Sequence, residues 1–454
     1  MSVYEEYKQK LRTPAEAVQA VKSGDWVDYG ADFAQPTALD MALAARRNEL
    51  SDVNIRGSLT YYPRQVIEQD PDGKAFTYQS WHFSGLDRKY RRKYPGKVFF
   101  NPMLFRNLTS YYTKCHIPVD VAMLSVSPMD NKGFFNFSLC NVANKEVADV
   151  AKIVILEVHK NLPRVCGGMN HQIHISDVDY IVEANPETEE YPLPTTGKQI
   201  PATDIDRRIA ALIVPEIRNG ATIQLGIGGM PNTVGQLIAE SDLKDLGGHT
   251  ELMNDAYRIL YEKGVMNNTK KAFAPGVISW ATMFGTQELY DWASENPVLS
   301  SYPIHVVNDP AVIATMDDFV SVNSCVDIDL YGQISSESSG YTHISGTSGQ
   351  LDFIEGAYRS KGGKSFICCP STFTDKKTGN VRSRIVLHFQ EGTAVTAPRP
   401  VPHYVVTEFG KVCIAGSPIW QRAEKMISIA HPDFREKLIK EAEAHHIWRR
   451  SNKR

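Results

Sequence analysis

The sequence predicts an α/β fold made of two similar parts. Three observations lead to this prediction: a length of 454 residues, an alternation of short apolar runs with amphipathic segments, and a motif that recurs in both halves. A chain of this length exceeds one ordinary domain, so each part can bury a core of its own. Alternating strand-like and helix-like segments are typical of a mostly parallel sheet covered by helices.

Four short apolar runs give the clearest strand predictions. Each is rich in β-branched residues and lacks a polar alternation, so we expect both of its faces to be buried, as in a parallel sheet. The runs are AKIVILEV (151–158), ATIQLGI (221–227), KSFICC (364–369) and HYVVTEF (403–409).

Three amphipathic segments predict helices, because their apolar residues recur at helical spacing. In the last of them, Pro432 suits the first helical position and Asp433 falls in the first turn, where the helix dipole favours negative charge. The segments are PATDIDRRIAALIVPEI (201–217), TVGQLIAESDLKDL (233–246) and PDFREKLIKEAEAHH (432–446).

The segment EANPETEEYPLPTTGKQIP (183–201) predicts a linker. It holds four prolines and four glutamates and shows no apolar periodicity. It separates an N-terminal domain, 1–182, from a C-terminal domain, 202–454, and both have plausible domain sizes.

A motif recurs in the two predicted domains. In SGDWVDYGADFAQP (23–36) and NGATIQLGIGGMP (219–231), one glycine precedes a strand-like run and a second follows six residues later. A proline comes five or six residues after that, then a helical pattern, and Arg56 and Glu251 stand 20 residues beyond the two prolines. Two copies of one α/β unit explain this repeat. An accidental likeness between two strand–glycine–helix units is the alternative.

Composition and charge argue against several classes of function. The net charge of −3 provides no bulk attraction to nucleic acid or an anionic membrane, and no apolar run is long enough for a membrane helix. We interpret the basic run Arg88 to Lys93 as a solvated face. The acidic start MSVYEEYKQKLRTPAEAV is not a signal peptide, and seven cysteines without zinc spacing suit reduced thiols, so we expect a cytoplasmic protein without a metal site.

The segment Gly226-Ile227-Gly228-Gly229-Met230 follows a predicted strand and precedes a predicted helix. Glycines there let backbone N–H groups approach a ligand at the positive end of a helix, so the loop could bind phosphate or stabilise an oxyanion. The structural alternative is a tight strand-to-helix turn. Pro231 stands where the dinucleotide fingerprint requires its third glycine, which weakens the hypothesis of a nicotinamide-dependent dehydrogenase.

Two further features are candidates for chemistry. Glu251 lies one helix length beyond Gly226, which returns the chain to the sheet edge where ligands bind, and a carboxylate there can act as nucleophile or base. By spacing alone, a solvated or helix-capping glutamate is the alternative. The loop around Gly346 and Gly349 could present N–H groups to an anionic or amide-rich ligand, or be an ordinary surface turn.

Taken together, these motifs resemble the acetyl-CoA hydrolase/transferase family of the class I CoA transferases, especially its butyryl-CoA:acetate and 4-hydroxybutyrate CoA-transferase members. The order of the motifs carries the resemblance, and SWHFSG (80–85), MDNKGFFNFS (129–138) and PATDID (201–206) add to it in and near the first half. The ordered motifs are GIGGMPN (226–232), DLGGHTE (245–251), VNSCVDIDLYGQISSES (322–338), ISGTSGQLDF (344–353) and YVVTEFG (404–410).

The resemblance implies two similar open α/β domains with the active site between them, and it implies roles for named residues. Glu251 is expected to be the catalytic nucleophile. The backbone from Gly226 through Ile227, Gly228 and Gly229 to Met230 is expected to contact CoA and the oxyanion. Further CoA contacts are expected at Val326, Gly346, Gly349 and Gln350.

The activity implied by the resemblance is transfer of CoA between short carboxylic acids through a glutamyl-CoA thioester. CoA thioesters are then substrates, no permanently bound cofactor is needed, and the assembly is expected to be a homodimer or a dimer of dimers. Butyrate and acetate are the first choice of acids, followed by 4-hydroxybutyrate, propionate and itaconate; Arg56, Arg91 or Arg92 could pair a second carboxylate. An acyl-CoA hydrolase and a non-enzymatic CoA-binding protein are the alternatives.

Overall fold

The computed structural model describes residues 2–184, 193–196, 201–226 and 228–449. Residue contacts divide the chain into two compact units, and each unit takes residues from both halves of the sequence. Unit 1 comprises Met1–Lys198, Glu251–Asp255 and Ser279–Val307, and unit 2 comprises Gln199–Thr250, Ala256–Ile278 and Asn308–Arg454.

Most of the predicted linker, 183–201, lies outside the described residues. Its described part, 193–196, is held within unit 1: the Tyr290 hydroxyl donates to the carbonyl oxygen of Pro194 at 2.6 Å, and the Tyr61 hydroxyl donates to that of Thr195 at 2.7 Å. The domain limits at 182 and 202 stay predictions.

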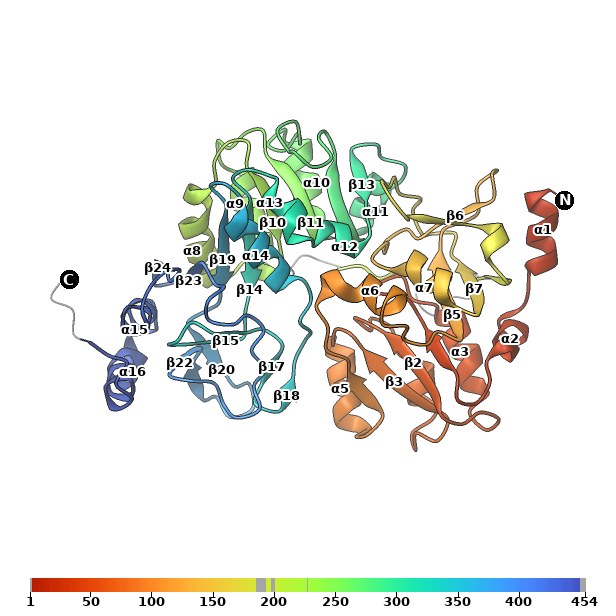
Figure 1. Ribbon diagram of the computed structural model, residues 1–454, viewed down its shortest axis with the longest axis horizontal. Helices are drawn as coiled ribbons and strands as arrows, with labels where there is room; N and C mark the ends of the chain where they lie inside the picture. The colour runs from red at the N-terminus through yellow and green to blue at the C-terminus, as the bar shows by residue number, and fades with distance from the viewer. Residues whose placement is uncertain (1, 185–192, 197–200, 227, 450–454) are drawn as a thin grey trace. The chain divides into compact units, whose positions relative to one another are not determined.

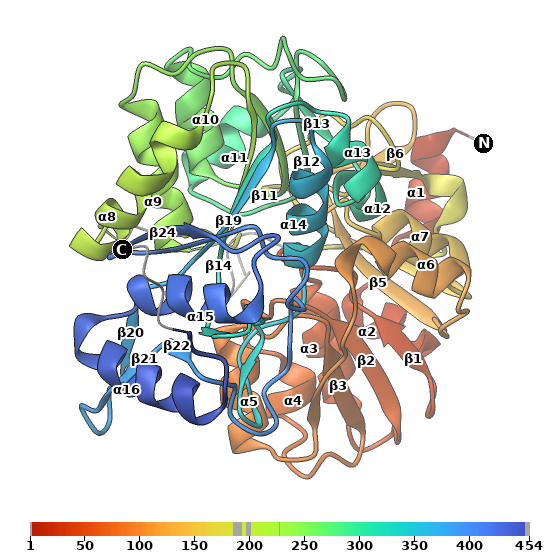
Figure 2. The same cartoon turned by 60° about the vertical axis from the view of Figure 1, so that its left-hand side comes forward.

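Unit 1 is built around a parallel sheet in the order β4-β3-β2-β1-β5-β7-β9. Its strands lie in the red to yellow part of Figure 1, and Figure 2 shows β1, β2 and β3 side by side. The strands are β1 (Trp26–Asp28), β2 (Val53–Gly57), β3 (Phe76–Ser80), β4 (Val98–Phe100), β5 (Val121–Val126), β7 (Ile153–Val158) and β9 (Tyr180–Glu183).

Helices and short strands complete unit 1. Ser2 and Ser84 begin α1 and α5 with reciprocal capping boxes, which satisfy N–H groups that the helix leaves unpaired. The helices are α1 (Val3–Lys10), α2 (Pro14–Ala17), α3 (Thr37–Ala45), α4 (Gln65–Glu68), α5 (Gly85–Lys93), α6 (Leu108–Thr113), α7 (Asn144–Val150), α11 (Gln287–Ala293) and α12 (Ile304–Val307), and the remaining strands are β6 (Phe134–Asn136), β8 (Gln172–His174), most of β12 (Ile278–Met283) and β13 (Leu299–Ser301).

The strands of unit 2 follow the order β11-β10-β14-β19-β23-β24, parallel except for the last pair. All four predicted apolar runs form strands, one in unit 1 as β7 and three here as β10, β19 and β23. The strands are β10 (Thr222–Leu225), β11 (Gly247–Met253), β14 (Val320–Ser324), β19 (Lys364–Cys368), β23 (Tyr404–Thr407) and β24 (Gly410–Cys413).

Helices cover both faces of this second sheet. The crossovers after β10 and β14 run in opposite directions, so right-handed connections put α9 and α14 on opposite faces, as Figure 2 shows. Helices form in all three predicted segments, as α8, α9 and α16, and Pro432 begins α16. The predicted segment 233–246 is wrong in its second half, because α9 begins at Gly229 and ends at Ala239. The helices are α8 (Asp204–Ile213), α9 (Gly229–Ala239), α10 (Asp255–Glu262), α13 (Pro310–Ala314), α14 (Gln350–Arg359), α15 (Ile419–Ser428) and α16 (Pro432–Ala444).

Three small sheets form the rest of unit 2. They are β15 (Asp327–Asp329) with β16 (Ile334–Ser335) and β22 (Ile385–Val386), β17 (Ser338–Ser339) with β18 (Thr342–His343), and β20 (Thr372–Thr374) with β21 (Val381–Ser383). The seven cysteines are all free thiols. Within the described ranges, no helix is long and apolar enough to cross a membrane.

The internal repeat is confirmed in the topology of the two sheets. The strands β2-β1-β5-β7-β9 and β11-β10-β14-β19-β23 follow the same order, and a helix follows the second strand of each series: α3 follows β1 and α9 follows β10. The strand register corrects the count made from the sequence. Asp28 pairs with Arg56, so Gly30, two residues farther along, corresponds to Ser58, just after β2, and not to Arg56.

Arg56 has a structural role. It is neither solvated nor exposed for binding an anion. Its side chain is 2% exposed, its Nε lies 3.4 Å from Asp28 Oδ2, and its guanidinium lies over the rings of Trp26 and Tyr112. The Tyr112 hydroxyl donates to the same Asp28 carboxylate at 2.7 Å. A buried charge needs such partners, and these use Arg56 within the core of unit 1.

Lys271 gives a prediction for the pH dependence of stability. It is 3% exposed, its Nζ donates to the Gly248 carbonyl at 3.0 Å, and burial lowers its pKa from 10.5 to about 7. The unfolded chain therefore binds more protons than the folded chain between these two values. We expect the free energy of unfolding to rise with pH across this window, by at most about 1.4 kcal/mol per pH unit from this group.

Urea unfolding of the wild type and of Lys271→Met at several pH values across the window checks this expectation. The variant cannot take up the proton, so its free energy of unfolding should rise less steeply with pH. Equal slopes in the two proteins would contradict the assignment.

Candidate active site

The predicted ligand-binding segments of unit 2 meet at the carboxyl end of β14. In the strand order β11-β10-β14-β19, the crossovers from β10 and β14 leave in opposite directions, which makes this a topological switch point where open α/β sheets bind ligands. The Gly226 N–H donates to the Val322 carbonyl at 2.9 Å, and the Gln350 side-chain amide donates to the Ser324 carbonyl at 2.7 Å. Both predicted loops are therefore anchored to the same strand.

The glycine loop exposes backbone at the start of α9. Gly228 is the N-cap residue with φ 123° and ψ 175°, and no side chain caps the helix. Gly228 and Gly229 are exposed, whereas the Met230 side chain is buried below them; Ile227 lies outside the described residues. Uncapped N–H groups at the positive end of an 11-residue helix can receive a negatively charged oxygen.

The second predicted loop, around Gly346 and Gly349, is less exposed than the sequence indicated. Gly346 and Gly349 are both buried, and Gly349 is the N-cap residue of α14 without a side-chain cap. The Gln350 side chain accepts a hydrogen bond from the Ser336 hydroxyl at 2.6 Å, in addition to its bond to Ser324. The Val326 N–H donates to the Ser335 carbonyl, and the Val326 carbonyl accepts from the Arg384 guanidinium, each at 2.8 Å. Both backbone groups of Val326 are therefore paired within the protein.

A buried amide pair beneath the glycine loop was not predicted from the sequence. Gln224 and Asn323 exchange two hydrogen bonds of 3.1 Å across the ends of β10 and β14. A Cβ on Gly226 would come within 2.8 Å of Asn323 Oδ1, so the pair and the glycine fit each other closely. The signal was available: each residue is an amide near the end of a buried strand, and each lies in a motif already singled out or next to one.

Glu251 lies in β11, among the residues assigned to unit 1. It is partly exposed, whereas Leu252 and Met253 after it are buried. The Met253 carbonyl accepts a hydrogen bond from the Phe284 N–H at 3.0 Å, and the Phe284 ring stacks on Phe33 with 4.3 Å between centroids. This series of contacts joins the strand of Glu251 to the loop that follows β1.

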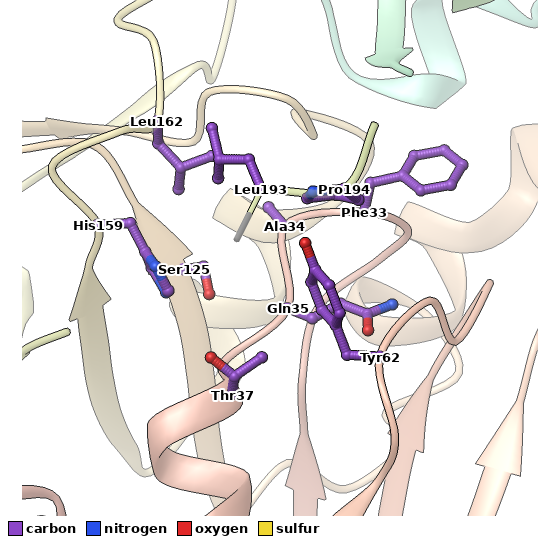
Figure 3. A pocket seen from close by; sticks show the side chains of 10 residues that line it. All are labelled: Phe33, Ala34, Gln35, Thr37, Tyr62, Ser125, His159, Leu162, Leu193 and Pro194. Carbon is purple, nitrogen blue, oxygen red and sulfur yellow. The ribbon is translucent and has the colours of Figure 1, made fainter. Parts of the chain in front are cut away.

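Unit 1 has a small cavity at its own switch point, between β1 and β5 (Figure 3). It lies at the carboxyl ends of the strands and at the start of α3, the position that corresponds to the glycine loop of unit 2. The space between its side chains is about that of one water molecule. Its lining includes Phe33, Gln35, Thr37, Tyr62, Ser125 and His159.

His159 lines this cavity, and a buried glutamate, Glu157, lies behind it. Glu157, which is fully buried, accepts hydrogen bonds from the N–H groups of Ala38 at 3.2 Å and Leu39 at 2.8 Å, at the start of α3. His159 Nε2 lies 2.8 Å from the same carboxylate. Negative charge at a helix N-terminus is stabilised, so Glu157 fixes α3 and orients His159.

Ser125 stands opposite Glu157 in the register of β5 and β7. Its side chain is 1% exposed, and its Oγ has no hydrogen-bond partner among the described residues. Ser125, Glu157 and His159 were not identified from the sequence. Polar residues at alternate positions near the ends of two apolar strands were the signal that could have found them.

Asp32 is a second buried carboxyl in the loop after β1. Its backbone has φ 55°, outside the usual range for a non-glycine residue, and the Ser58 hydroxyl both donates to its Oδ1 and accepts from its N–H at 2.8 Å. Burial raises the pKa of Asp32 from 3.8 to about 6. Its contacts with Ser58 fix the loop that carries Phe33.

In the part of the chain that the structure describes, no three His, Cys, Asp or Glu side chains are grouped as metal ligands would be. The candidate groups of unit 1 are the Glu251 carboxylate and the small cavity lined by Ser125 and His159. Those of unit 2 are the exposed backbone N–H groups at the start of α9.

Two family models match this chain. The acetyl-CoA hydrolase/transferase N-terminal domain matches residues 1–189, and the C-terminal domain of the same family matches residues 285–442. The chain belongs to the acetyl-CoA hydrolase/transferase family. The family recognised from the sequence motifs is thereby confirmed.

Individual members of the acetyl-CoA hydrolase/transferase family resemble the chain over its full length. A butyryl-CoA:acetate CoA-transferase of Anaerostipes caccae is 48% identical over 100% of both chains. A 4-hydroxybutyrate coenzyme A transferase of Clostridium kluyveri is 37% identical over 96% of this chain and 97% of that one. The solved structure of RipA from Yersinia pestis is 34% identical, with a TM-score of 0.88 over 98% of this chain and 100% of the other. The mixed α/β architecture with its parallel sheets is thus consistent with a two-domain CoA-transferase fold.

Proposed function

We propose that this protein is an acyl-CoA:carboxylate CoA-transferase for short-chain acids, with butyryl-CoA and acetate as the first pair to test. The observation that carries the proposal is full-length identity of 48% to a protein named for that reaction. The likeness to a 4-hydroxybutyrate coenzyme A transferase makes the 4-hydroxy acid the next candidate.

Glu251 is the proposed nucleophile. Its carboxylate attacks the acyl-CoA carbonyl, the C–S bond breaks, and CoA leaves as a thiolate from an acyl-glutamyl anhydride. The thiolate then attacks the glutamyl carbonyl, which releases the first acid as a carboxylate and leaves a glutamyl-CoA thioester. The incoming carboxylate reverses both steps and leaves as the new acyl-CoA, with ping-pong kinetics. Since the thioester energy is conserved, the cycle needs no ATP, metal or resident cofactor.

The exposed start of α9 is the proposed oxyanion site. Each step passes through a tetrahedral oxyanion, which preorganised N–H donors such as those of Gly228 and Gly229 stabilise. The strand register supports this pairing of roles. Ile223 pairs with Gly248, and Gly226 and Glu251 each stand three residues farther along their strands. Gly226, Ile227 and Met230 complete the proposed CoA-binding loop.

Val326 and the loop from Gly346 through Gly349 to Gln350 are proposed as further CoA contacts. The bond from Gln350 to Ser324 at the end of β14, two residues before Val326, supports this role. The hydrogen bonds of the Gln350 side chain indicate that its backbone, rather than its side chain, is available to the ligand. The homodimer or dimer of dimers and the cytoplasmic location remain predictions from the sequence.

Intact mass spectrometry after incubation with butyryl-CoA and no acceptor acid tests the proposed function. We expect a CoA-sized adduct that maps to the peptide containing Glu251 and disappears when acetate is added. Release of free CoA without an adduct would identify a hydrolase instead. Neither an adduct nor CoA release with butyryl-, acetyl-, propionyl- or succinyl-CoA would contradict the proposal.

A further inference from the structure

We infer that the cavity of unit 1 receives the far end of the acyl chain, and that Ser125 binds a terminal hydroxyl there. The substrate class would then be unbranched four-carbon acids whose chain ends in a methyl or hydroxyl group, with dicarboxylic acids excluded. This inference rests on the proposed function, because it concerns the acyl group that is transferred.

The cavity is connected to the strand of the proposed nucleophile within one unit. Phe33 lines the cavity and stacks on Phe284, whose N–H binds the carbonyl of Met253, two residues beyond Glu251. In a strand, residues two apart face the same side, so Glu251 and Met253 point to one face of β11. The Phe284–Phe33 pair therefore links the end of the strand that carries Glu251 to the lining of the cavity, and the proposed acyl chain follows this apolar pair.

The size of the cavity suits the end of a short chain. Its free space is about that of one water molecule, enough for a methyl or hydroxyl group and too small for a carboxylate with its solvation. Most of the wall around this space is apolar, as Figure 3 shows for Phe33, Leu162, Leu193 and Pro194. A methylene chain is therefore bound by burial of apolar surface.

Ser125 supplies a hydrogen-bonding group that no described residue uses. Two other polar side chains of the lining are engaged: Gln35 donates to the backbone carbonyls of Asp32, Ser58 and Leu59, and Thr37 donates to Glu157. The Ser125 Oγ is buried and finds no partner among the described residues. A buried hydroxyl without a partner is costly, so a substrate hydroxyl that bonds to it removes this cost.

The charge around the cavity disfavours a second carboxylate. The described lining contains no lysine or arginine, and the N–H groups that begin α3 already bind Glu157. A carboxylate at the chain end would lose its hydration next to another carboxylate, which is unfavourable unless a cation compensates for it. Arg56 does not compensate, because it is paired with Asp28 in the core.

The test compares three donors with acetate as acceptor: butyryl-CoA, 4-hydroxybutyryl-CoA and succinyl-CoA. For the wild type we expect transfer from the first two and the lowest kcat/KM from succinyl-CoA. In Ser125→Ala, the ratio of kcat/KM for 4-hydroxybutyryl-CoA to that for butyryl-CoA should fall about tenfold, the loss expected for one hydrogen bond.

Ser127→Ala is the matched control. Ser127 lies two residues farther along, is equally buried, and also has an Oγ without a partner among the described residues, but it does not line the cavity. Its ratio should equal that of the wild type, and circular dichroism should show both variants folded.

Two outcomes overturn the inference alone: an unchanged ratio in Ser125→Ala, or wild-type transfer from succinyl-CoA as efficient as from butyryl-CoA. Absence of transfer from all three donors would instead overturn the proposed function, and the inference with it.

Discussion

Replacing Glu251 by alanine is expected to lower CoA transfer by on the order of 10⁴-fold or more, because no other group then forms the covalent intermediate. The measurement is acyl exchange between butyryl-CoA and labelled acetate, followed by chromatography of the CoA esters. The CoA adduct seen by mass spectrometry should disappear in the same variant. Circular dichroism should stay unchanged, since a partly exposed side chain is removed from a strand whose following residues are buried.

Two other variants sharpen this test. Glu251→Asp keeps the charge but withdraws the carboxylate by one methylene, so transfer should fall strongly while hydrolysis falls less, because water can reach a misplaced acyl group more easily than a second acid can. Glu262→Ala removes an exposed glutamate at the end of α10 and serves as the control, with wild-type transfer expected. Near-normal transfer by Glu251→Ala would remove this residue from the mechanism.

Gly228→Ala is expected to lower kcat/KM by roughly 100-fold, the typical loss when one oxyanion donor is displaced. The cause is the backbone and not crowding: the nearest heavy atom to a Cβ at Gly228 is Pro231 Cδ at 4.0 Å, but φ is 123°. An alanine does not adopt this conformation without strain, so the loop must turn its N–H groups away from their present direction. Steady-state kinetics with butyryl-CoA and acetate measure the loss.

Gly264→Ala separates the effect on activity from the effect on stability. Gly264 also has a positive φ, 71°, and a Cβ at this position would meet no heavy atom within 4 Å, but the residue lies after α10 and outside the proposed site. We expect a comparable decrease in thermal stability for both variants and a loss of transfer only in Gly228→Ala. Equal transfer by the two variants would exclude the α9 N–H groups as oxyanion donors.

The sequence predicted those features that depend on neighbouring residues. The apolar runs and amphipathic segments became β7, β10, β19, β23, α8, α9 and α16, because burial and periodicity are local properties of a segment. The glycine loop and the Gly346 to Gln350 loop were found as motifs, and the parallel sheet then brought both to the end of β14. Whether Glu251 and these loops act as predicted awaits the variants above.

The features that were missed depend on pairing between distant strands. Ser125 and Glu157 are 32 positions apart, and only the register of β5 against β7 makes them neighbours. Arg56 looked like an available cation in the sequence, but Asp28 stands opposite it across the sheet and withdraws it from solvent. No local pattern reveals which polar residue of a strand will find a partner and which, like Ser125, has none among the described residues.

The repeated topology has a consequence for altering the protein. The exposed glycine turn before α9 and the small cavity before α3 occupy corresponding positions in the two units, each with its own hydrophobic core. Substitutions around Ser125 therefore change the packing of one scaffold and leave the other intact. Mutant libraries designed to accept new acids can be confined to the loops after β1, β5 and β7. The residues proposed to bind CoA then stay unchanged. If the cavity of unit 1 receives the acyl chain as inferred, the duplicated α/β unit makes acid preference separately adjustable.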